Sequence, residues 1–352
     1  MNVKPEQSSL ENEIKARANS LGFQLCGITS AAPPQEYFRY ERWVENDNHA
    51  EMNYLASPYH METRRQPERL FPGLQSIIVL GSMYALPSPS TLLQKNMGVL
   101  SGYMAGEDYH QSIPTRLEPL VVFLESLSPA TRRPRIFTDS SPILERELGS
   151  RAGLGWIGRN SCLISPQMGS GFLLAEIFTD LPLLPDPPFM ADRCGSCQRC
   201  VEACPTKCIL PDRTLDSKRC ISYATIENRG SIPTWMDQKI SHQLAGCDIC
   251  QSVCPWNRGS LQQHPFPPEN QFDLDQMLKL IRITAEEFTA RFGTRAVSRV
   301  KRSGLVRNLT ILLKHSGDRR AALVAKDLLL TEKDPLIRKY LEWLWVENEQ
   351  DK

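Results

Sequence analysis

Cysteine spacing is the feature of this 352-residue sequence that most narrows its possible folds. Nine of its eleven cysteines lie between Cys194 and Cys254, and the run from Cys194 to Pro205 reads C-x2-C-x2-C-x3-C-P. A second run, from Cys247 to Pro255, reads C-x2-C-x3-C-P and is preceded at a distance by Cys220. Such spacing lets three thiolates converge on one [4Fe–4S] cluster while the fourth reaches another. The sequence therefore predicts two [4Fe–4S] clusters in one bacterial-ferredoxin-type module.

The ferredoxin pattern assigns four cysteines to each cluster. The first set is Cys194, Cys197, Cys200 and Cys254, and the second set is Cys204, Cys220, Cys247 and Cys250. Zinc is the alternative, but a zinc ion is satisfied by four thiolates and leaves no role for eight. Cys26, Cys162 and Cys208 are expected to be small buried hydrophobic side chains. Cys208, four residues after Cys204, is the one for which this expectation is weakest.

Composition leaves the class of partner open but indicates a compartment. Lys and Arg number 41 against 40 Asp and Glu, so the net charge of +1 neither favours nor excludes nucleic acid. The first thirty residues contain no apolar segment of the kind found in secretory signals, and no apolar run approaches the roughly 20 residues that span a bilayer. Cysteines gathered in one stretch indicate metal ligation in a reducing cytosol. We therefore expect a cytoplasmic protein without a membrane segment.

Hydrophobic periodicity predicts an α+β multidomain chain. Helices are expected over residues 11–21 and 115–127, with Pro119 in the first turn of the second helix. Four buried strands are expected, at residues 23–28, 76–81, 135–138 and 172–178. This alternation of helix and strand predicts an α/β domain.

Proline-rich segments suggest where the domains meet. The predicted α/β domain covers residues 1–185, the two-cluster ferredoxin module covers 186–260, and a helical domain covers 261–352. Within the last of these, residues 319–330 and 335–346 resemble one HEAT-type helical pair.

Three further motifs resemble those of epoxyqueuosine reductases. They are G-E-D-Y-H at residues 106–110, D-S-S-P-I-L-E-R at 139–146 and R-A-G-L-G-W-I-G-R-N at 151–160. The resemblance extends from about residue 10 to the C-terminus. It implies an enzyme that uses cobalamin and two [4Fe–4S] clusters to reduce the epoxide of epoxyqueuosine in tRNA, the last step in making queuosine at the wobble position. It also implies a cobalamin- and substrate-binding role for residues 1–185 and a fold related to reductive dehalogenases.

Removal of an epoxide oxygen needs two electrons and protonation of the leaving alkoxide. Asp139 matches the proposed proton donor of the family. A carboxylic acid serves in that role only where apolar surroundings raise its pKa enough to keep it protonated. The alternative is that Asp139 is the N-cap of a helix beginning near Pro142, with Ser140 and Ser141 as competitors for that position.

The resemblance further implies a set of cofactor contacts. They are Arg64, Ser101, Asp139, Asn160 and Asp248. By residue type alone, Arg64 would be a surface arginine, Asn160 a turn residue and Asp248 a solvated loop carboxylate. The three glycines within residues 153–158 are expected to allow close backbone approach to a bulky cofactor.

A run of six cations without an acidic residue between them suggests contact with tRNA phosphates. The run consists of Arg291, Arg295, Arg299, Lys301, Arg302 and Arg307. The C-terminal domain is therefore expected to grip the anticodon arm, chiefly through Arg295, Arg299, Lys301 and Arg302, whereas the alternative is a solvated helix face. Tyr109 and His110 are expected either to line the substrate pocket or to be ordinary helix-start residues.

The overall prediction is a monomeric reductase that receives electrons from an external carrier of flavodoxin or ferredoxin type. Two alternatives remain open. A corrinoid dehalogenase acting on a small molecule would not need the cationic run. A non-catalytic iron–sulfur electron carrier, or a tRNA-binding adaptor, would not need Asp139.

Overall fold

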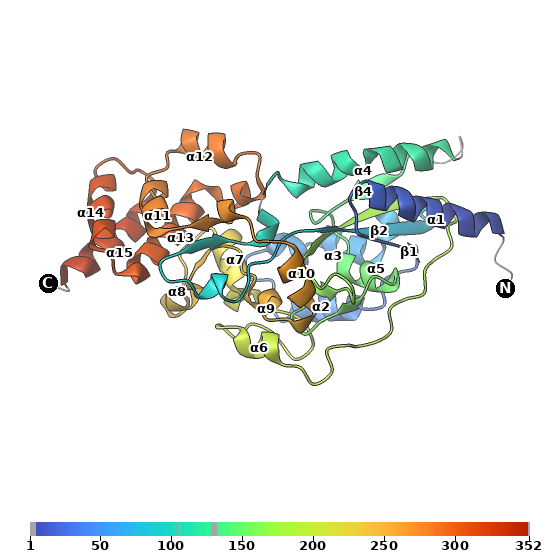
Figure 1. Ribbon diagram of the computed structural model, residues 1–352, viewed down its shortest axis with the longest axis horizontal. Helices are drawn as coiled ribbons and strands as arrows, with labels where there is room; N and C mark the ends of the chain where they lie inside the picture. Colours follow the sequence, from blue (N-terminus) through green and yellow to red (C-terminus); the bar gives the residue numbers. More distant parts are fainter. Residues whose placement is uncertain (1–4, 105, 128–131, 351–352) are drawn as a thin grey trace.

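The computed structural model of the chain describes residues 5–104, 106–127 and 132–350. It is elongated, with a β-sheet and its helices at one end, a group of helices at the other, and the cysteine-rich segment along one side between them (Figure 1). None of the helices within these ranges is both long and apolar enough to cross a bilayer.

A four-stranded antiparallel sheet organises the N-terminal part. Its strand order is β1 (Leu25–Ser30), β2 (Ser76–Met83), β7 (Phe172–Thr179) and β4 (Arg135–Phe137), so all four predicted strands are present. The antiparallel pairing makes this an α+β arrangement, whereas the predicted α/β domain would have a parallel sheet. Alternation of helix and strand along the sequence does not determine the end at which the chain re-enters the sheet, so strand direction could not be predicted from it.

Both faces of this sheet are buried. Ile78 and Leu80 of β2 face a core shared with helices α1 (Pro5–Ser20) and α4 (Tyr109–Ser126). Ile77 and Val79 point to the opposite core, which includes Leu148 of α5 (Glu145–Arg151). Figure 1 shows α1 and α4 on one side of the sheet and α5 on the other. Burial on both faces explains why β2 is a continuous apolar run in the sequence.

Helix α4 corrects the prediction for this part of the chain. It begins at Tyr109, six residues before the predicted start, and both Pro114 and Pro119 lie inside it, so Pro119 is not in its first turn. The Asp108 carboxylate caps the helix by accepting a hydrogen bond from the backbone N–H of His110 (3.1 Å). Burial of Leu117 against the sheet contributes to packing that offsets the backbone hydrogen bonds lost at the prolines.

The remaining helices and strands before the C-terminal part are short. Helices α2 (Tyr37–Glu45) and α3 (Pro58–Arg65) lie between β1 and β2, and the two-residue strands β5 (Trp156–Ile157) and β6 (Leu163–Ile164) form a hairpin. The cysteine-rich segment contains five helices: α6 (Arg199–Ala203), α7 (Ile221–Ile226), α8 (Thr234–Ile240), α9 (Ile249–Ser252) and α10 (Arg258–Gln263). A small sheet of order β8 (Gln243–Ala245), β3 (Gly98–Leu100) and β9 (Gln271–Phe272) holds residues near 100 beside the second cysteine run.

The C-terminal part is helical, as predicted. It consists of α11 (Leu274–Leu280), α12 (Ala285–Phe292), α13 (Lys301–Ser316), α14 (Arg319–Leu328) and α15 (Pro335–Gln350), and the last two are the predicted helical pair. Its core also contains Leu100, Ile221, Met236 and Leu244. The packing of these helices therefore continues across residue 260 into the cysteine-rich segment.

Candidate active site

Asp139 lies on the loop that follows β4, in a left-handed backbone conformation (φ 53°) that non-glycine residues rarely adopt. Its Oδ2 accepts hydrogen bonds from Tyr109 Oη (2.7 Å) and from His110 Nε2 (3.1 Å). Its backbone N–H donates to Glu145 Oε1 (2.6 Å). Helix α5 begins at Glu145 and not near Pro142, so the interpretation of Asp139 as a helix cap is wrong.

His110 lies between two carboxylates. Its Nδ1 is 2.6 Å from Asp108 Oδ1, and its Nε2 is 3.1 Å from Asp139 Oδ2. Both contacts are made only when both ring nitrogens carry protons. Hydrogen bonding to Asp139 accordingly raises the pKa of His110 above its usual value, against the effect of burial. Tyr109 and His110 therefore start α4 and also contact Asp139, whereas their place in a substrate pocket stays a prediction.

The surroundings of Asp139 are more polar than a carboxylic acid donor requires. Burial alone would raise its pKa, but the hydrogen bonds from His110 and Tyr109 lower it below the usual value. Asp139 is consequently an ionised carboxylate next to a protonated imidazole, and the expectation of an apolar environment is not met. The transferable proton resides on the Asp139–His110 pair.

Two neighbouring carboxyl groups, those of Glu145 and Glu176, lie next to the Asp139 loop. Glu176 of β7 is fully buried, and no partner of its carboxyl oxygens other than Glu145 is found among the described residues. Burial and then the nearby charge of Asp139 raise the pKa of Glu145 to about 7, and burial with the proximity of Glu145 raises that of Glu176 further. Raised pKa values of this kind mean that the pair retains a proton more readily than two solvated carboxyl groups do. The pair therefore holds the backbone of Asp139 through Glu145.

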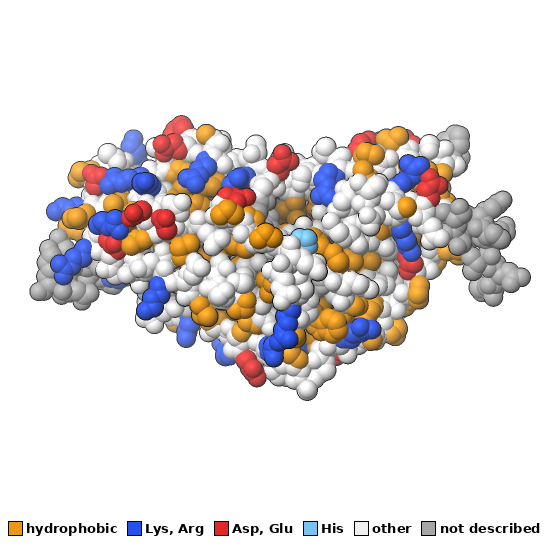
Figure 2. Space-filling model, viewed as in Figure 1, with side chains coloured by type: hydrophobic (Ala, Val, Ile, Leu, Met, Phe, Trp, Pro, Cys, Tyr) orange, Lys and Arg blue, Asp and Glu red, His pale blue; other side chains and the backbone are white. Residues whose placement is uncertain are grey.

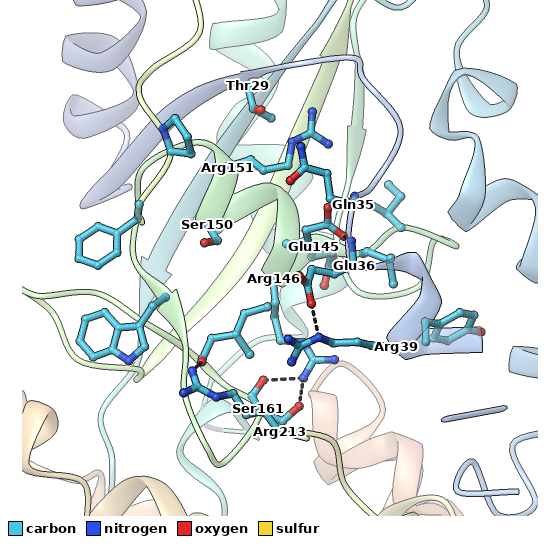
Figure 3. Close-up of a pocket in the computed structure, with 18 of the residues that line it drawn as sticks. Thr29, Gln35, Glu36, Arg39, Glu145, Arg146, Ser150, Arg151, Ser161 and Arg213 are labelled. Carbon is cyan, nitrogen blue, oxygen red and sulfur yellow. Dashed lines mark hydrogen bonds and ion pairs between the residues drawn. The ribbon is translucent and has the colours of Figure 1, made fainter. Parts of the chain in front are cut away.

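A cavity of about 1250 Å³ opens beside Asp139. Figure 3 shows side chains converging on it from well-separated segments: Arg151 lies near Thr29 and Gln35, whereas Arg39, Arg146 and Arg213 gather at the other end. Its wall mixes charged groups with apolar and aromatic ones that include Tyr40, Trp43, Ile143, Trp156 and Phe189. The volume exceeds the roughly 300–1,000 Å³ typical of small-molecule pockets. Such a cavity suits a large ligand with apolar faces and many hydrogen-bonding groups.

The predicted cofactor contacts fall into two groups. Arg64 and Asp139 line the cavity, and Arg64 is buried, with a guanidinium nitrogen 2.9 Å from His60 Nδ1, so it is not a surface arginine. Ser101 and Asp248 are fully buried near the second cysteine set, where Asp248 Oδ2 accepts a hydrogen bond from the N–H of Gly102 (2.8 Å). Asp248 is therefore not a solvated loop carboxylate, and burial raises its pKa to about 6.

Asn160 keeps an unused hydrogen-bond donor, whereas the neighbouring glycines are required by packing within the protein. Asn160 is buried and accepts a hydrogen bond from the N–H of Cys162 (3.4 Å), whereas its Nδ2 has no partner within the described part of the chain. Its turn role is thus compatible with a free donor for a ligand. The glycines are required by the protein itself, because a Cβ at Gly153 would meet Pro187 O at 2.8 Å and one at Gly155 would meet Ile164 O at 2.0 Å. Their predicted close approach to a cofactor stays a prediction.

The thiol pKa values indicate which of the predicted cluster cysteines influence one another. Burial raises the pKa of Cys254, and the nearby Cys200, Cys194 and Cys197 raise it further, so these four lie together. The thiol of Cys247 is influenced in the same way by Cys220 and Cys204. The thiol of Cys250 is influenced by Cys247 and Cys220 but also by Cys200 of the other set, so the division into two ligand sets stays a prediction.

Cys208 is buried with the second set. Its Sγ lies 3.5 Å from Cys204 Sγ, and its thiol also hydrogen-bonds Cys220. Cys208 therefore contacts two predicted ligands and is more than an isolated hydrophobic side chain. Spacing alone could not show this contact.

Only part of the predicted cationic run lies at the surface. Arg307 is fully buried and donates to the carbonyls of Ala224, Asn228 and Gly230, so its assignment to a phosphate-binding surface is wrong. Arg302 is paired with the nearly buried Glu332 (2.5 Å). Among the residues predicted for RNA contact, Lys301 is exposed and Arg295 is half-buried.

Arg299 occupies a different position from the rest of the run. Its Nε lies 2.6 Å from Glu227 Oε1, and its charge contributes to lowering the pKa of Asp139. Arg299 therefore lies near the candidate catalytic loop and links it to the C-terminal part of the chain.

Comparisons with known proteins agree with these observations. Residues 64–140 match the family model described as Epoxyqueuosine reductase QueG, DUF1730, and residues 193–257 match that described as 4Fe-4S double cluster binding domain. The second match confirms the predicted iron–sulfur module and argues against zinc. An epoxyqueuosine reductase of Pseudomonas aeruginosa is 34% identical over 346 residues, which cover 96% of this chain and 94% of the relative.

Solved structures of epoxyqueuosine reductases are also similar to this chain. The structure of epoxyqueuosine reductase from Streptococcus thermophilus is similar, with a TM-score of 0.86 and 27% identity, over 97% of this chain and 91% of that chain. A crystal structure of epoxyqueuosine reductase with an epoxyqueuosine-modified tRNA-Tyr stem loop has a TM-score of 0.84 and 29% identity, over 96% and 90% of the two chains.

Proposed function

The chain belongs to the epoxyqueuosine reductase family, and on this premise we propose that it reduces the epoxide of epoxyqueuosine in tRNA to give queuosine. The reaction removes the epoxide oxygen, so it consumes two electrons and two protons and releases water. The observation that carries the proposal is the position of Asp139, which faces a large cavity while it is hydrogen-bonded to a protonated histidine. A non-catalytic electron carrier would have no use for this arrangement.

Electrons would be supplied through the double-cluster module. The first cysteine set would hold one [4Fe–4S] cluster, and the second set would hold the other. The second set lies beside Asp248, which contacts the backbone next to Ser101. In this order the two clusters would form a chain of redox sites between the protein surface and the loop that holds Asp139.

The large cavity fits the cobalamin that the family resemblance implies. Its volume and mixed lining suit a corrin ring with its amide side chains, and Arg64 in its wall would supply hydrogen bonds. When bound, cobalamin supplies a strong reductant for carbon–oxygen bonds. The buried Asp248 and Ser101 would position the cluster side of this site.

The residues of the protein would deliver the proton. The Asp139–His110 pair holds a proton, and Asp139 is half-exposed toward the cavity, so it can pass that proton to the departing oxygen. Tyr109 fixes the Asp139 carboxylate from one side, and the Glu145–Glu176 pair fixes its backbone from the other. His110 would be reprotonated through Asp108, whose carboxylate is hydrogen-bonded to its other ring nitrogen.

The tRNA would approach from the side of the C-terminal helices. Exposed Lys301 and half-buried Arg295 would contact phosphates, whereas Arg299 lies closer to the modified base because of its proximity to Asp139. Arg302 would position this segment through Glu332 rather than bind RNA directly. A tRNA substrate is compatible with a cytoplasmic monomer, which remains part of the proposal.

Nucleoside analysis tests the proposed function directly. Cells that lack this protein should accumulate epoxyqueuosine in their tRNA, and expression of the wild-type chain should restore queuosine. Expression of Asp139→Asn should not restore it, because the amide cannot exchange a proton with His110 in the same way. Normal queuosine in the deleted cells would contradict the proposal, provided that no second reductase is expressed.

A further inference from the structure

The two cysteine sets have different surroundings. Residues next to the first set are exposed, including Arg193, Gly195, Gln198 and Arg199. Residues next to the second set are buried, including Thr206, Ile221 and Asp248. The first set thus lies nearer to solvent than the second, and Trp156 and Asp192 in the wall of the large cavity also contact Cys194 of the first set. Electrons that arrive from outside the protein would therefore reach the first set before the second.

A surface groove of about 670 Å³ leads to the first set. It lies between α6, α9 and α10, and the predicted cluster ligand Cys254 is part of its wall. Arg199 of α6 and Arg258 of α10 are both exposed and line the same groove. Val253 and Leu261 add apolar surface between them. A cluster bound to the first set would therefore lie close to a groove that combines apolar contacts with arginines.

The charge around this groove is predominantly positive. Exposed Arg193 lies near the ring of Trp256 (5.9 Å), beside the groove, and adds a third cation to Arg199 and Arg258. Of the nearby acids, Asp192 is paired with Arg213 (2.5 Å), which leaves Glu202 in the wall. Figure 2 shows Lys and Arg side chains between the positions that α10 and α6 occupy in Figure 1, with apolar side chains around them. This distribution is complementary to an acidic partner.

We propose that this groove, lined by Arg199, Cys254 and Arg258, is the docking surface for an acidic one-electron carrier protein. The inference rests on the proposed function, because only a reductase needs repeated delivery of electrons. In each encounter the reduced carrier loses one electron, and the cluster of the first set passes from the 2+ to the 1+ state. Two encounters supply the two electrons that epoxide removal consumes. A small interface with charge complementarity gives the fast association and release that such an exchange requires.

Charge reversal tests this surface. The reconstituted full-length protein would carry Arg199→Glu together with Arg258→Glu, and loss of cluster absorbance would be followed after mixing with flavodoxin hydroquinone, an acidic carrier. We expect reduction about tenfold slower than in the wild type, with a much weaker dependence on ionic strength. Reduction by reduced methyl viologen, a small cation, should be no slower. Arg319→Glu at the start of α14 is the control for a single Arg→Glu reversal, because it places the same substitution at an exposed position on the C-terminal helices, and it is compared with Arg199→Glu and Arg258→Glu made one at a time.

Two results would overturn the inference. One is a flavodoxin rate and salt dependence equal to those of the wild type in the double variant, and the other is a wild-type protein that flavodoxin cannot reduce. If the double variant does not bind iron, Arg199→Gln with Arg258→Gln removes the charges without reversing them and should slow the flavodoxin reaction to a smaller extent. Turnover of epoxyqueuosine-containing tRNA with methyl viologen as the sole reductant tests the proposed function independently, because it needs no carrier.

Discussion

A single imidazole, His110, faces carboxylates through both of its ring nitrogens. His110→Ala should lower turnover by about a hundredfold, because the proton source next to Asp139 is lost while the cavity is unchanged. The raised pKa of His110 means that its proton is fully present below pH 6.5 and is lost as the pH rises through the raised value. Wild-type activity should therefore fall as the pH rises through this raised pKa, above 6.5, and the variant should not show this fall.

Single-turnover rates measured from pH 6 to pH 10 would check the role of His110. Gln111→Ala is a suitable control, since Gln111 is the next residue of α4 and is exposed. Equal rates and equal pH profiles for His110→Ala and the wild type would remove His110 from the mechanism.

The raised pKa values of Glu145 and Glu176 predict that the stability of the fold depends on pH. Because the folded-state pKa values of both groups are raised, their bound proton stabilises the fold fully below about pH 4.5, and this stabilisation is lost as the pH rises through about 7 and beyond. The free energy of unfolding should fall by about 1–3 kcal/mol between pH 5 and pH 8 through this pair. Glu176→Gln supplies a permanent donor to Glu145, so its pH dependence should be flatter.

Thermal unfolding of apoprotein at several pH values would measure this difference. Glu269→Gln, at an exposed position, should keep the wild-type pH dependence. A Glu176→Gln curve parallel to that of the wild type would mean that the pair does not share a proton. The pair itself could not be predicted, because Glu176 belongs to no motif and its burial depends on the strand order β2-β7-β4.

At the scale of elements, periodicity located helices and strands well but could not place their charged residues. The six cations from residues 291 to 307 look equivalent in the sequence, yet α13 turns Arg307 into the core and leaves Lys301 at the surface. Helix α4 began earlier than expected because the cap at Asp108 and the apolar face outweigh two prolines. Strand direction and side-chain orientation depend on tertiary packing, which no local pattern reports.

The contrast between Arg307 and Lys301 can be tested on α13. Arg307→Leu should lower the free energy of unfolding by about 3 kcal/mol, because three backbone carbonyls, of which that of Ala224 is buried, lose the donor that the fully buried guanidinium supplies. Lys301→Ala should leave stability almost unchanged and reduce the salt dependence of tRNA binding by about one phosphate contact. Denaturant unfolding and filter binding at several salt concentrations would separate the two effects. A stable Arg307→Leu protein with weakened tRNA binding would reverse this assignment.

At the scale of the whole molecule, the proposed electron path would run from the surface through the cysteine-rich segment to the loop that holds Asp139. The three-stranded sheet β8-β3-β9 holds Ser101 beside Asp248, and the cysteine-rich segment shares its core with the C-terminal helices. The sequence predicted the clusters because ligand spacing is a local property. It could not predict this path, because the contacts between residues near 100 and 245 depend on pairing of distant strands.

Cys220 lies outside both ferredoxin-like runs in the sequence. Its assignment as a cluster ligand therefore depends more on the fold than that of any other predicted ligand. If it binds the second cluster, Cys220→Ser should lower the iron content of the anaerobically reconstituted protein from about eight to about four atoms per chain. Cys208→Ser is the matched control, since Cys208 contacts Cys204 and Cys220 but is not a predicted ligand. It should retain about eight irons. Iron analysis with electron paramagnetic resonance of the reduced protein would measure both, and a loss of four irons in Cys208→Ser with none in Cys220→Ser would exchange the two assignments.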